Sequence, residues 1–190
     1  PPSSDESFLP LQIMADNFQD SRVFENFNIL FNQENTLPRD FKNSELVIIG
    51  AHGGVTDRLH TFRSVSDEAN LRERYQEVAK HLTNCGVVIL FVCSSGRFNS
   101  HPEAKTTISF AKELIKNGCS AVIASPWPLD VTFTSHWLSN FLENWIAAGD
   151  TVNQAVSKAN ILIAQRYSYD PLKYLALTIY GNPLRKYQNS

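Results

Sequence analysis

The amino-acid sequence predicts an α/β fold, a three-layer α/β/α sandwich around a central, mostly parallel sheet. Short apolar runs alternate with amphipathic segments along the 190 residues, which is the pattern of strands joined by helices. The apolar runs are continuous and rich in Val and Ile, as in strands whose two faces are both covered by helices. The sequence has no internal repeat or low-complexity tract, so one layered domain with right-handed crossovers accounts for the pattern.

Two of the predicted strands end in loops of small residues. Leu46–Ile49 leads into Gly50–Gly54, and Val87–Val92 leads into Cys93–Gly96. The apolar spacing over Ser66–Leu82 predicts the helix that connects them. Ligands of such sheets bind at the carboxyl ends of the strands, so we expect a functional site where these two loops meet.

The second half of the chain continues the alternation. The predicted elements are a helix over Glu103–Lys116, a strand over Ala121–Ser125, helices over Val131–Ala147 and Thr151–Gln165, and a last strand over Leu175–Tyr180. Proline cannot donate to a strand ladder, so the two prolines after the middle strand predict a loop there. This loop is a candidate pocket wall.

We expect a single domain. Residues 1–40 are assigned to it as an N-terminal segment without predicted elements, and residues 41–190 form the sandwich. The opening residues Pro1–Ser7 carry no initiating Met, basic leader or apolar signal core, and they look like the cut edge of a longer protein.

Composition excludes several classes of protein. With 43% hydrophobic and 19% charged residues, the chain is neither disordered nor fibrous. Its formal net charge is −2 and its basic residues are scattered, which argues against a direct nucleic-acid partner. The apolar runs are shorter than the roughly 20 residues of a membrane-spanning helix, so no membrane partner is expected.

The three cysteines lack the spacing of metal ligands or of a Cys-x-x-Cys pair. We therefore expect no metal and a reducing, cytoplasmic location. Cys85 and Cys119 each precede an apolar run, where a small buried thiol is the expected role. Cys93 differs, because it follows a strand and opens a loop of small residues.

His52 and Cys93 are candidate catalytic residues. If their strands are neighbours, the backbones lie about 4.8 Å apart and the two side chains can meet. An imidazole beside a thiol takes its proton or holds it as an ion pair, which makes the sulfur a nucleophile without any cofactor. The backbone N–H groups of Gly53 and Cys93 are candidate donors to an oxyanion. Taken alone, a single His and a single Cys at strand ends are also compatible with structural roles.

The sequence around these residues resembles a known family. "IIGAHGG" and "VVILFVCSSGR" look like the His-Gly and Cys-x-Ser-Gly blocks of the caspase-like fold. The later segments "AVIASPWPLD", "AAGDTVNQAVSKAN" and "LALTIYGNP" resemble the CHAT family of caspase-like, clan CD cysteine peptidases. The resemblance covers Glu45–Pro183. "CSSG" departs from the commoner variants of the Cys block, and this change removes no catalytic group.

The resemblance implies a caspase-like CHAT peptidase domain over residues 41–190. Its implied activity is cleavage of a peptide bond in a protein substrate by a His52–Cys93 dyad, without a cofactor. It also implies control by a regulatory protein or a fused helical-repeat domain, within a bacterial antiviral defence or signalling system. It does not imply cleavage after Asp.

Three further residues are candidates for substrate binding. Ser125 and Trp127 match the strand along which related folds bind an extended peptide, although Trp127 is equally compatible with the core. Asp130 has two interpretations. It either faces the specificity pocket and favours a basic substrate residue, or it caps the helix that begins at Val131.

Two other functions remain open at this point. A caspase-like domain can serve as a non-catalytic interaction or sensor module, since fold alone does not guarantee activity. The strand-end cleft can also bind a small molecule, but the sequence has no glycine-rich phosphate loop that favours this.

Overall fold

The structure is a computed structural model that describes residues 41–56, 59–63, 72–93, 110–125, 129 and 131–188. Residues 51–56, 59–63, 72–76, 92–93 and 131 are described by their backbone.

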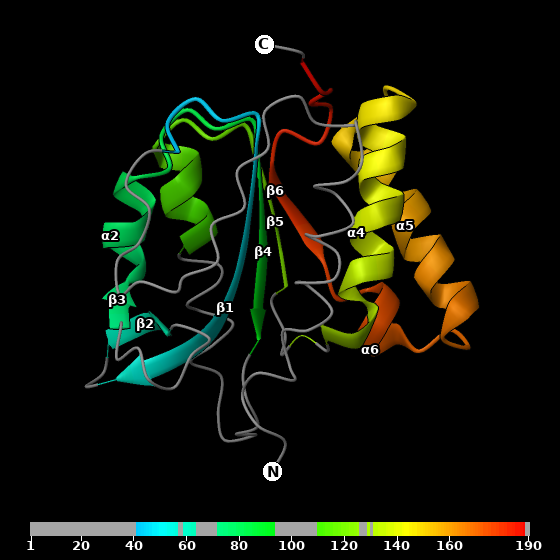
Figure 1. Cartoon of the computed structure of the whole chain (residues 1–190), viewed down its shortest axis with the longest axis horizontal. Coiled ribbons are helices and arrows are strands. Elements are labelled where there is room, and N and C mark those ends of the chain that lie inside the picture. Colours follow the sequence, from blue (N-terminus) through cyan, green and yellow to red (C-terminus); the bar gives the residue numbers. More distant parts are fainter. Residues whose placement is uncertain are drawn as a thin grey trace, which may run out of the picture.

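The described strands form one sheet (Figure 1). They are β1 (Leu46–Thr56), β2 (Leu59–Arg63), β3 (Arg72–Arg74), β4 (Val87–Cys93), β5 (Ala121–Ala124) and β6 (Thr178–Gly181). Their order across the sheet is β3-β2-β1-β4-β5-β6. β4 pairs in parallel with β1 on one side and with β5 on the other, whereas the outer pairings are antiparallel. The central part of the sheet is therefore parallel, as predicted.

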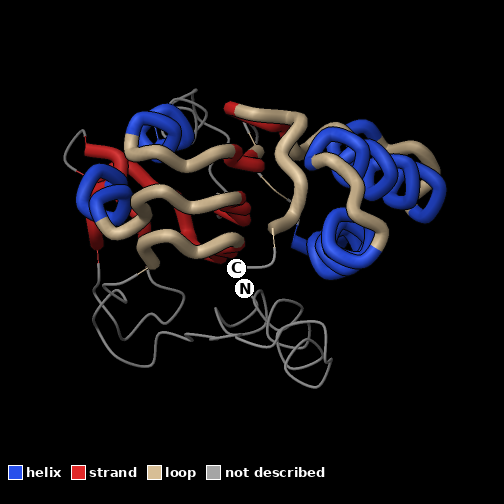
Figure 2. The backbone as a smooth tube through the Cα atoms, turned by 90° about the horizontal axis from the view of Figure 1, so that it is seen from above, coloured by secondary structure: helices blue, strands red, loops and turns tan. Residues whose placement is uncertain are grey.

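Helices cover both faces of this sheet (Figure 2). α2 (Tyr75–Lys80) and a helix that includes residues 110–116 lie on one face. α4 (Thr134–Leu142) and α5 (Val152–Arg166) lie on the other. The predicted three-layer α/β/α sandwich is confirmed, and the family comparison given below agrees with it.

The side chains of β4 alternate between two hydrophobic cores. Val87, Ile89 and Phe91 are fully buried in the core beneath α4 and α5, which we call the α4–α5 core. Val88 and Leu90 are fully buried in the core beneath α2, which we call the α2 core. Because successive strand residues point to opposite faces, a strand between two helical layers must be apolar at every position. This explains the continuous apolar runs.

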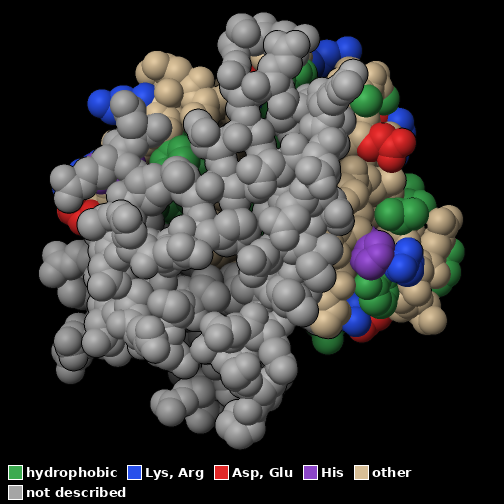
Figure 3. All heavy atoms as spheres, in the orientation of Figure 1, with side chains coloured by type: hydrophobic (Ala, Val, Ile, Leu, Met, Phe, Trp, Pro, Cys, Tyr) green, Lys and Arg blue, Asp and Glu red, His purple; other side chains and the backbone are tan. Residues whose placement is uncertain are grey.

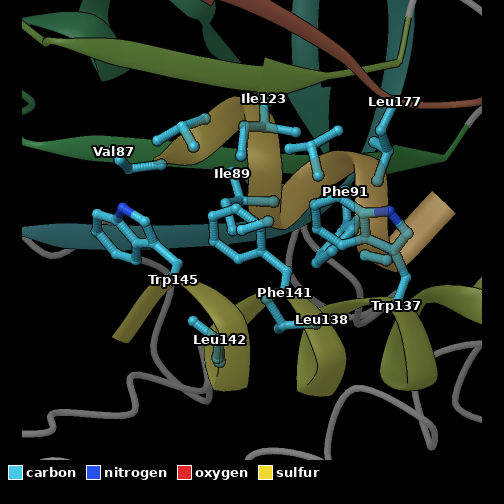
Figure 4. Close-up of a cluster of buried hydrophobic side chains, with 14 of the residues drawn as sticks. Val87, Ile89, Phe91, Ile123, Trp137, Leu138, Phe141, Leu142, Trp145 and Leu177 are labelled. Carbon is cyan, nitrogen blue, oxygen red and sulfur yellow. The ribbon is translucent and has the colours of Figure 1, made fainter. Parts of the chain in front are cut away.

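A row of aromatic side chains organises the α4–α5 core (Figure 4). Trp137 meets Phe91 edge-on at 6.2 Å between ring centroids and stacks on Phe141 at 5.2 Å. Phe141 in turn stacks on Trp145 at 5.7 Å. The Trp137 Nε1 also donates a 2.7 Å hydrogen bond to the Asn160 Oδ1 on α5. Each ring pair contributes about 0.5–1.5 kcal/mol beyond its buried area. The Phe91–Trp137 pair fixes α4 against β4, and the Trp137–Asn160 hydrogen bond ties α4 to α5.

The first loop prediction is wrong. Gly50–Gly54 was expected to be a loop, but these residues continue β1 as far as Thr56. The reason is that β2 pairs antiparallel with the second half of β1, from His52 opposite Arg63 to Thr56 opposite Leu59. Tertiary pairing overrides the weak strand propensity of the glycines here.

The helix predicted over Ser66–Leu82 is partly wrong. Arg72–Arg74 form the edge strand β3, which pairs with β2, and Tyr75–Lys80 form α2 as expected. Arg72–Arg74 lack the apolar spacing of a helix core, whereas Val78 on α2 is buried. Residues 66–71 lie outside the described part, as do residues 103–109 of the next predicted helix.

That next helix ends as predicted. Its described part, residues 110–116, is helical, and Gly118 adopts a positive φ of 89°. The Gly118 N–H donates to the Ile115 carbonyl and the Cys119 N–H to the Leu114 carbonyl, both at 3.1 Å. These bonds form a Schellman motif, which turns the chain into β5.

The C-terminal helices also follow the prediction. Val131–Phe133 form a 3-10 turn, α4 follows, and Glu143–Ala147 form a π-helical turn, so the predicted helix over 131–147 is confirmed as a continuous helical run. α5 begins one residue after its cap, Thr151. The last strand begins three residues later than predicted, because the short helix α6 (Pro171–Tyr174) precedes it.

Charged side chains of both signs are visible among the described residues in Figure 3. On the face shown in Figure 3, Lys and Arg side chains are interspersed with Asp and Glu. None of the helices in the described residues is both long and apolar enough to cross a membrane.

We predict that Phe141→Ala lowers the free energy of unfolding by about 3–5 kcal/mol, because it removes the central ring of a fully buried aromatic row. Urea denaturation followed by circular dichroism measures this change. Ile161→Ala on α5 is the control, since that side chain is 57% exposed and its loss should cost about 0.5 kcal/mol or less. Equal losses for the two variants would contradict the assigned core.

We predict that Thr151→Ala costs about 1 kcal/mol through loss of a capping box. The Thr151 Oγ1 accepts from the Gln154 N–H at 3.3 Å, and the Gln154 Oε1 accepts from the Thr151 N–H at 3.0 Å. Thr151→Ser keeps a capping hydroxyl and should retain most of the wild-type stability, as measured by thermal unfolding. Ser157→Ala, an exposed site within α5, is the matched control and should have little effect. A Ser157→Ala loss as large as that of Thr151→Ala would rule out the capping explanation.

Candidate catalytic site at the carboxyl edge of the sheet

The structure places His52 and Cys93 side by side on neighbouring strands. β1 and β4 pair in parallel register from Leu46 opposite Val87 to His52 opposite Cys93. The two residues are therefore direct cross-strand partners, with backbones about 4.8 Å apart. The pairing of β1 with β4 ends at this point, so both residues lie at the carboxyl edge of that ladder, where ligands bind in parallel sheets.

Positions 52 and 93 also share one face of the sheet. Ile48 on β1 packs against the α4–α5 core, and Ile89 and Phe91 on β4 are part of it. Strand residues two apart lie on the same face, which assigns positions 52 and 93 to the side that α4 and α5 cover. Register and face thus place positions 52 and 93 next to each other on one face of the sheet.

The neighbouring strand β5 stops short of Cys93. The ladder between β4 and β5 ends with Leu90 opposite Ala124, so β4 continues three residues further. Ser125, the next residue after β5, is 4% exposed and has the strand parity of Ile123, which belongs to the α4–α5 core. Ser125 therefore lies on the same face as the His–Cys pair. Trp127 and Asp130 lie outside the described residues.

Gly53 does not lie in a loop. It is part of β1 and pairs with Phe62 of β2. In a strand, consecutive residues direct their N–H groups to opposite sides. Of His52 and Gly53, one therefore directs its N–H toward β2 and the other toward the side of β4, where the ladder has just ended. An oxyanion donor from this part of β1 is thus a strand amide at the ladder's end.

The sheet also brings two arginines into the same cross-strand row. His52 is opposite Arg63 on β2, and Arg63 is opposite Arg72 on β3. The row across four strands therefore reads Cys93, His52, Arg63, Arg72. Neither arginine was predicted as a site residue from the sequence. Arg72 was assigned to a helix, and no strand was predicted around Arg63. The apolar and β-branched residues of Leu59–Arg63 were the available signal for a strand there.

Two titratable groups outside this pair, His136 and Tyr180, have shifted pKa values. His136 on α4 faces Arg166, and burial together with that charge lowers the pKa of its imidazole. Burial raises the pKa of Tyr180 on β6. Among the described residues, no group of three or more His, Cys, Asp or Glu side chains is arranged to hold a metal ion.

Fold and register define a class of protein. The described residues form a six-stranded sheet covered by helices on both faces, with a His opposite a Cys at the end of its central parallel ladder, and this arrangement is consistent with a caspase-like domain. Comparison with protein families agrees, since the CHAT domain family model matches residues 27–183. The chain belongs to the CHAT family, whose members are caspase-like cysteine peptidase domains. A search of curated proteins found no match.

The family match begins earlier than the resemblance seen in the sequence. It includes residues 27–44, in addition to the segment from Glu45 to Pro183 on which the resemblance was based. Part of the predicted N-terminal segment of residues 1–40 therefore lies within the matched region.

Proposed function

We propose that this domain is a cysteine endopeptidase that cleaves a protein substrate with His52 and Cys93. The observation that carries this proposal is the register of β1 and β4, which makes the two residues direct partners at the carboxyl edge of the sheet. Membership of a family of caspase-like cysteine peptidases supports it.

The chemistry follows from the two residues and the nearby amides. The Cys93 sulfur attacks the substrate carbonyl carbon, and backbone N–H groups of Cys93 and of the Gly53 segment stabilise the oxyanion. The C–N bond then breaks, and His52 gives its proton to the leaving amine. Water, deprotonated by His52, hydrolyses the resulting thioester and releases the free thiol. No cofactor takes part in these steps.

Substrate contacts are proposed on both sides of the dyad. Ser125 follows the short strand β5, beside the part of β4 that extends past it, where an extended peptide can add as a further strand, and we propose Trp127 as a further contact of that peptide. Asp130 directly precedes the 3-10 turn that begins at Val131, and we propose that its carboxylate caps this turn.

Arg63 and Arg72 supply a charge argument for the substrate. Like charges directly opposite on neighbouring strands destabilise a sheet, and an anionic group beside them offsets that cost. Because this pair continues the row of the dyad, we propose that it favours an acidic group on the substrate near the cleaved bond.

The biological setting rests on the family resemblance. We propose control by a regulatory protein or a fused helical-repeat domain, in a cytoplasmic bacterial defence or signalling system. The alternative of a non-catalytic interaction module is an outcome of the first experiment below.

We predict that a peptide acyloxymethyl ketone labels Cys93 and that His52→Ala slows this labelling at least about 100-fold, because the imidazole activates the thiol. Mass spectrometry of the labelled chain locates the site. His60→Ala is the matched control, since position 60 is opposite Val55, on the other face of the sheet from position 52.

Labelling of Cys93 at an unchanged rate in His52→Ala would contradict the dyad. If no peptide ketone labels the folded wild-type protein, either as the isolated domain or within its parent chain, the result would favour the non-catalytic interaction module.

We predict that peptides with an acidic residue before the cleaved bond are preferred and that Arg63→Gln lowers their kcat/KM by about tenfold or more, with little effect on neutral peptides. Lys112→Gln, which removes one positive charge from an exposed position on the 110–116 helix, is the control. If the enzyme instead prefers a basic residue before the cleaved bond, and this preference disappears in Asp130→Asn, the assignment to Arg63 and Arg72 is contradicted. That result would support the pocket role of Asp130.

A further inference from the structure

Two cysteines outside the candidate site lie next to each other at the opposite edge of the sheet. Cys85 and Cys119 each stand two residues before a strand, and these strands begin in register with Val87 opposite Ala121. The Ser120 N–H donates to the Cys85 carbonyl at 2.9 Å, which continues the pairing back toward the cysteines. The backbones of Cys85 and Cys119 are therefore held side by side.

Both side chains enter the same core. Cys85 is 1% exposed and Cys119 is 4% exposed, and both belong to the α2 core. The Cys85 Sγ lies 3.1 Å from the Phe41 carbonyl oxygen and the Cys119 Sγ lies 3.3 Å from the Leu82 carbonyl oxygen, each close enough to accept the thiol proton. Both cysteines are free thiols in this structure.

The two thiols also influence each other. The side-chain interaction with Cys119, together with burial, raises the pKa of the Cys85 thiol. The same interaction lowers the pKa of Cys119. Cys119 is thus the better nucleophile of the two, and Cys85 is the thiol held beside it.

This placement meets the geometric requirement for a disulfide. Directly paired backbones of neighbouring strands are about 4.8 Å apart, within the roughly 4.4–6.8 Å between Cα atoms that a disulfide spans. Cys93 cannot take the place of either residue. It lies at the far end of β4, roughly 25 Å from Cys85 at about 3.3 Å per strand residue.

We propose that Cys85 and Cys119 form a redox-modification site, a buried dithiol that hydrogen peroxide converts into an intramolecular disulfide. The Cys119 thiolate attacks a peroxide oxygen and becomes a sulfenic acid, with release of water after protonation. The Cys85 sulfur then attacks the sulfenic sulfur, the S–S bond forms, and a second water leaves. Two thiols lose two electrons, and one peroxide accepts them.

Burial defines which oxidants reach this site. Both thiols are almost inaccessible, so a molecule close to the size of water can react with the folded domain, whereas a bulky disulfide or alkylating reagent cannot. The disulfide would tie the amino ends of β4 and β5 together. It would also close the chain segment that contains Cys93 and the 110–116 helix, and thereby stabilise the domain.

Cys93→Ala provides the test background, because the chain has three cysteines and this variant retains only the proposed pair. The folded variant is treated with hydrogen peroxide, quenched with catalase, denatured and alkylated with N-ethylmaleimide. We expect an intact mass lower by two hydrogens with no maleimide added, and one linked peptide pair containing Cys85 and Cys119. Dithiothreitol should restore two alkylation sites.

A second readout is thermal unfolding of the same protein. Oxidation should raise the Tm by several degrees, and dithiothreitol should reverse this rise. The Cys93→Ala/Cys85→Ala protein is the matched control and should show neither the mass loss nor the rise.

Three results would overturn the proposal: a stable sulfinic acid on one cysteine, a disulfide between two chains, or disulfide formation only after unfolding in urea. The site lies at the opposite edge of the sheet from His52 and Cys93, so its test is independent of the proposed peptidase function.

Discussion

The parallel ladder between β1 and β4 is the constraint on which the rest of the structure depends. Its register makes His52 the partner of Cys93 at the carboxyl end of the ladder. A slip of one residue would move one of the two strands' side chains to the opposite face. The pair would then be separated by the sheet itself, and the apolar residues of that strand would meet the wrong core.

Burial on both faces is what makes this register secure. β4 is apolar at each described position because alternate side chains fill the two cores, and Phe91, two residues before Cys93, packs against Trp137. The proposed nucleophile is therefore the last residue of a strand whose side chains are buried on both faces. At the other end of the same strand, the turns that lead into β4 and β5 carry the buried Cys85 and Cys119. One strand thus connects the proposed catalytic edge with the proposed redox site.

Much of the fold could be predicted from local sequence. Continuous apolar runs identify β4 and β5, Thr151 with Gln154 identifies the start of α5, and Gly118 identifies a helix end. The extension of β1 through Gly50–Gly54 could not be predicted in this way, because it depends on pairing with β2. Residues of weak strand propensity form strands when a partner strand satisfies their backbone hydrogen bonds. The local sequence does not indicate which segment that partner is.

The candidate site also combines features that could be predicted from local sequence with features that depend on strand pairing. The position of Cys93 at the end of β4 could be predicted from the apolar run before it, whereas His52 lies within β1, which extends to Thr56. The structure makes the two residues direct partners. The row that adds Arg63 and Arg72 depends on two antiparallel pairings and could not be predicted from spacing alone.

The most direct test of the central claim is a crystal structure of the domain with a substrate-like peptide ketone bound covalently. The account predicts a thioether bond to the Cys93 sulfur, with the His52 imidazole within hydrogen-bonding distance of that sulfur or of the position of the leaving group. A peptide attached at another residue, or a His52 ring on the far face of the sheet from Cys93, would contradict it.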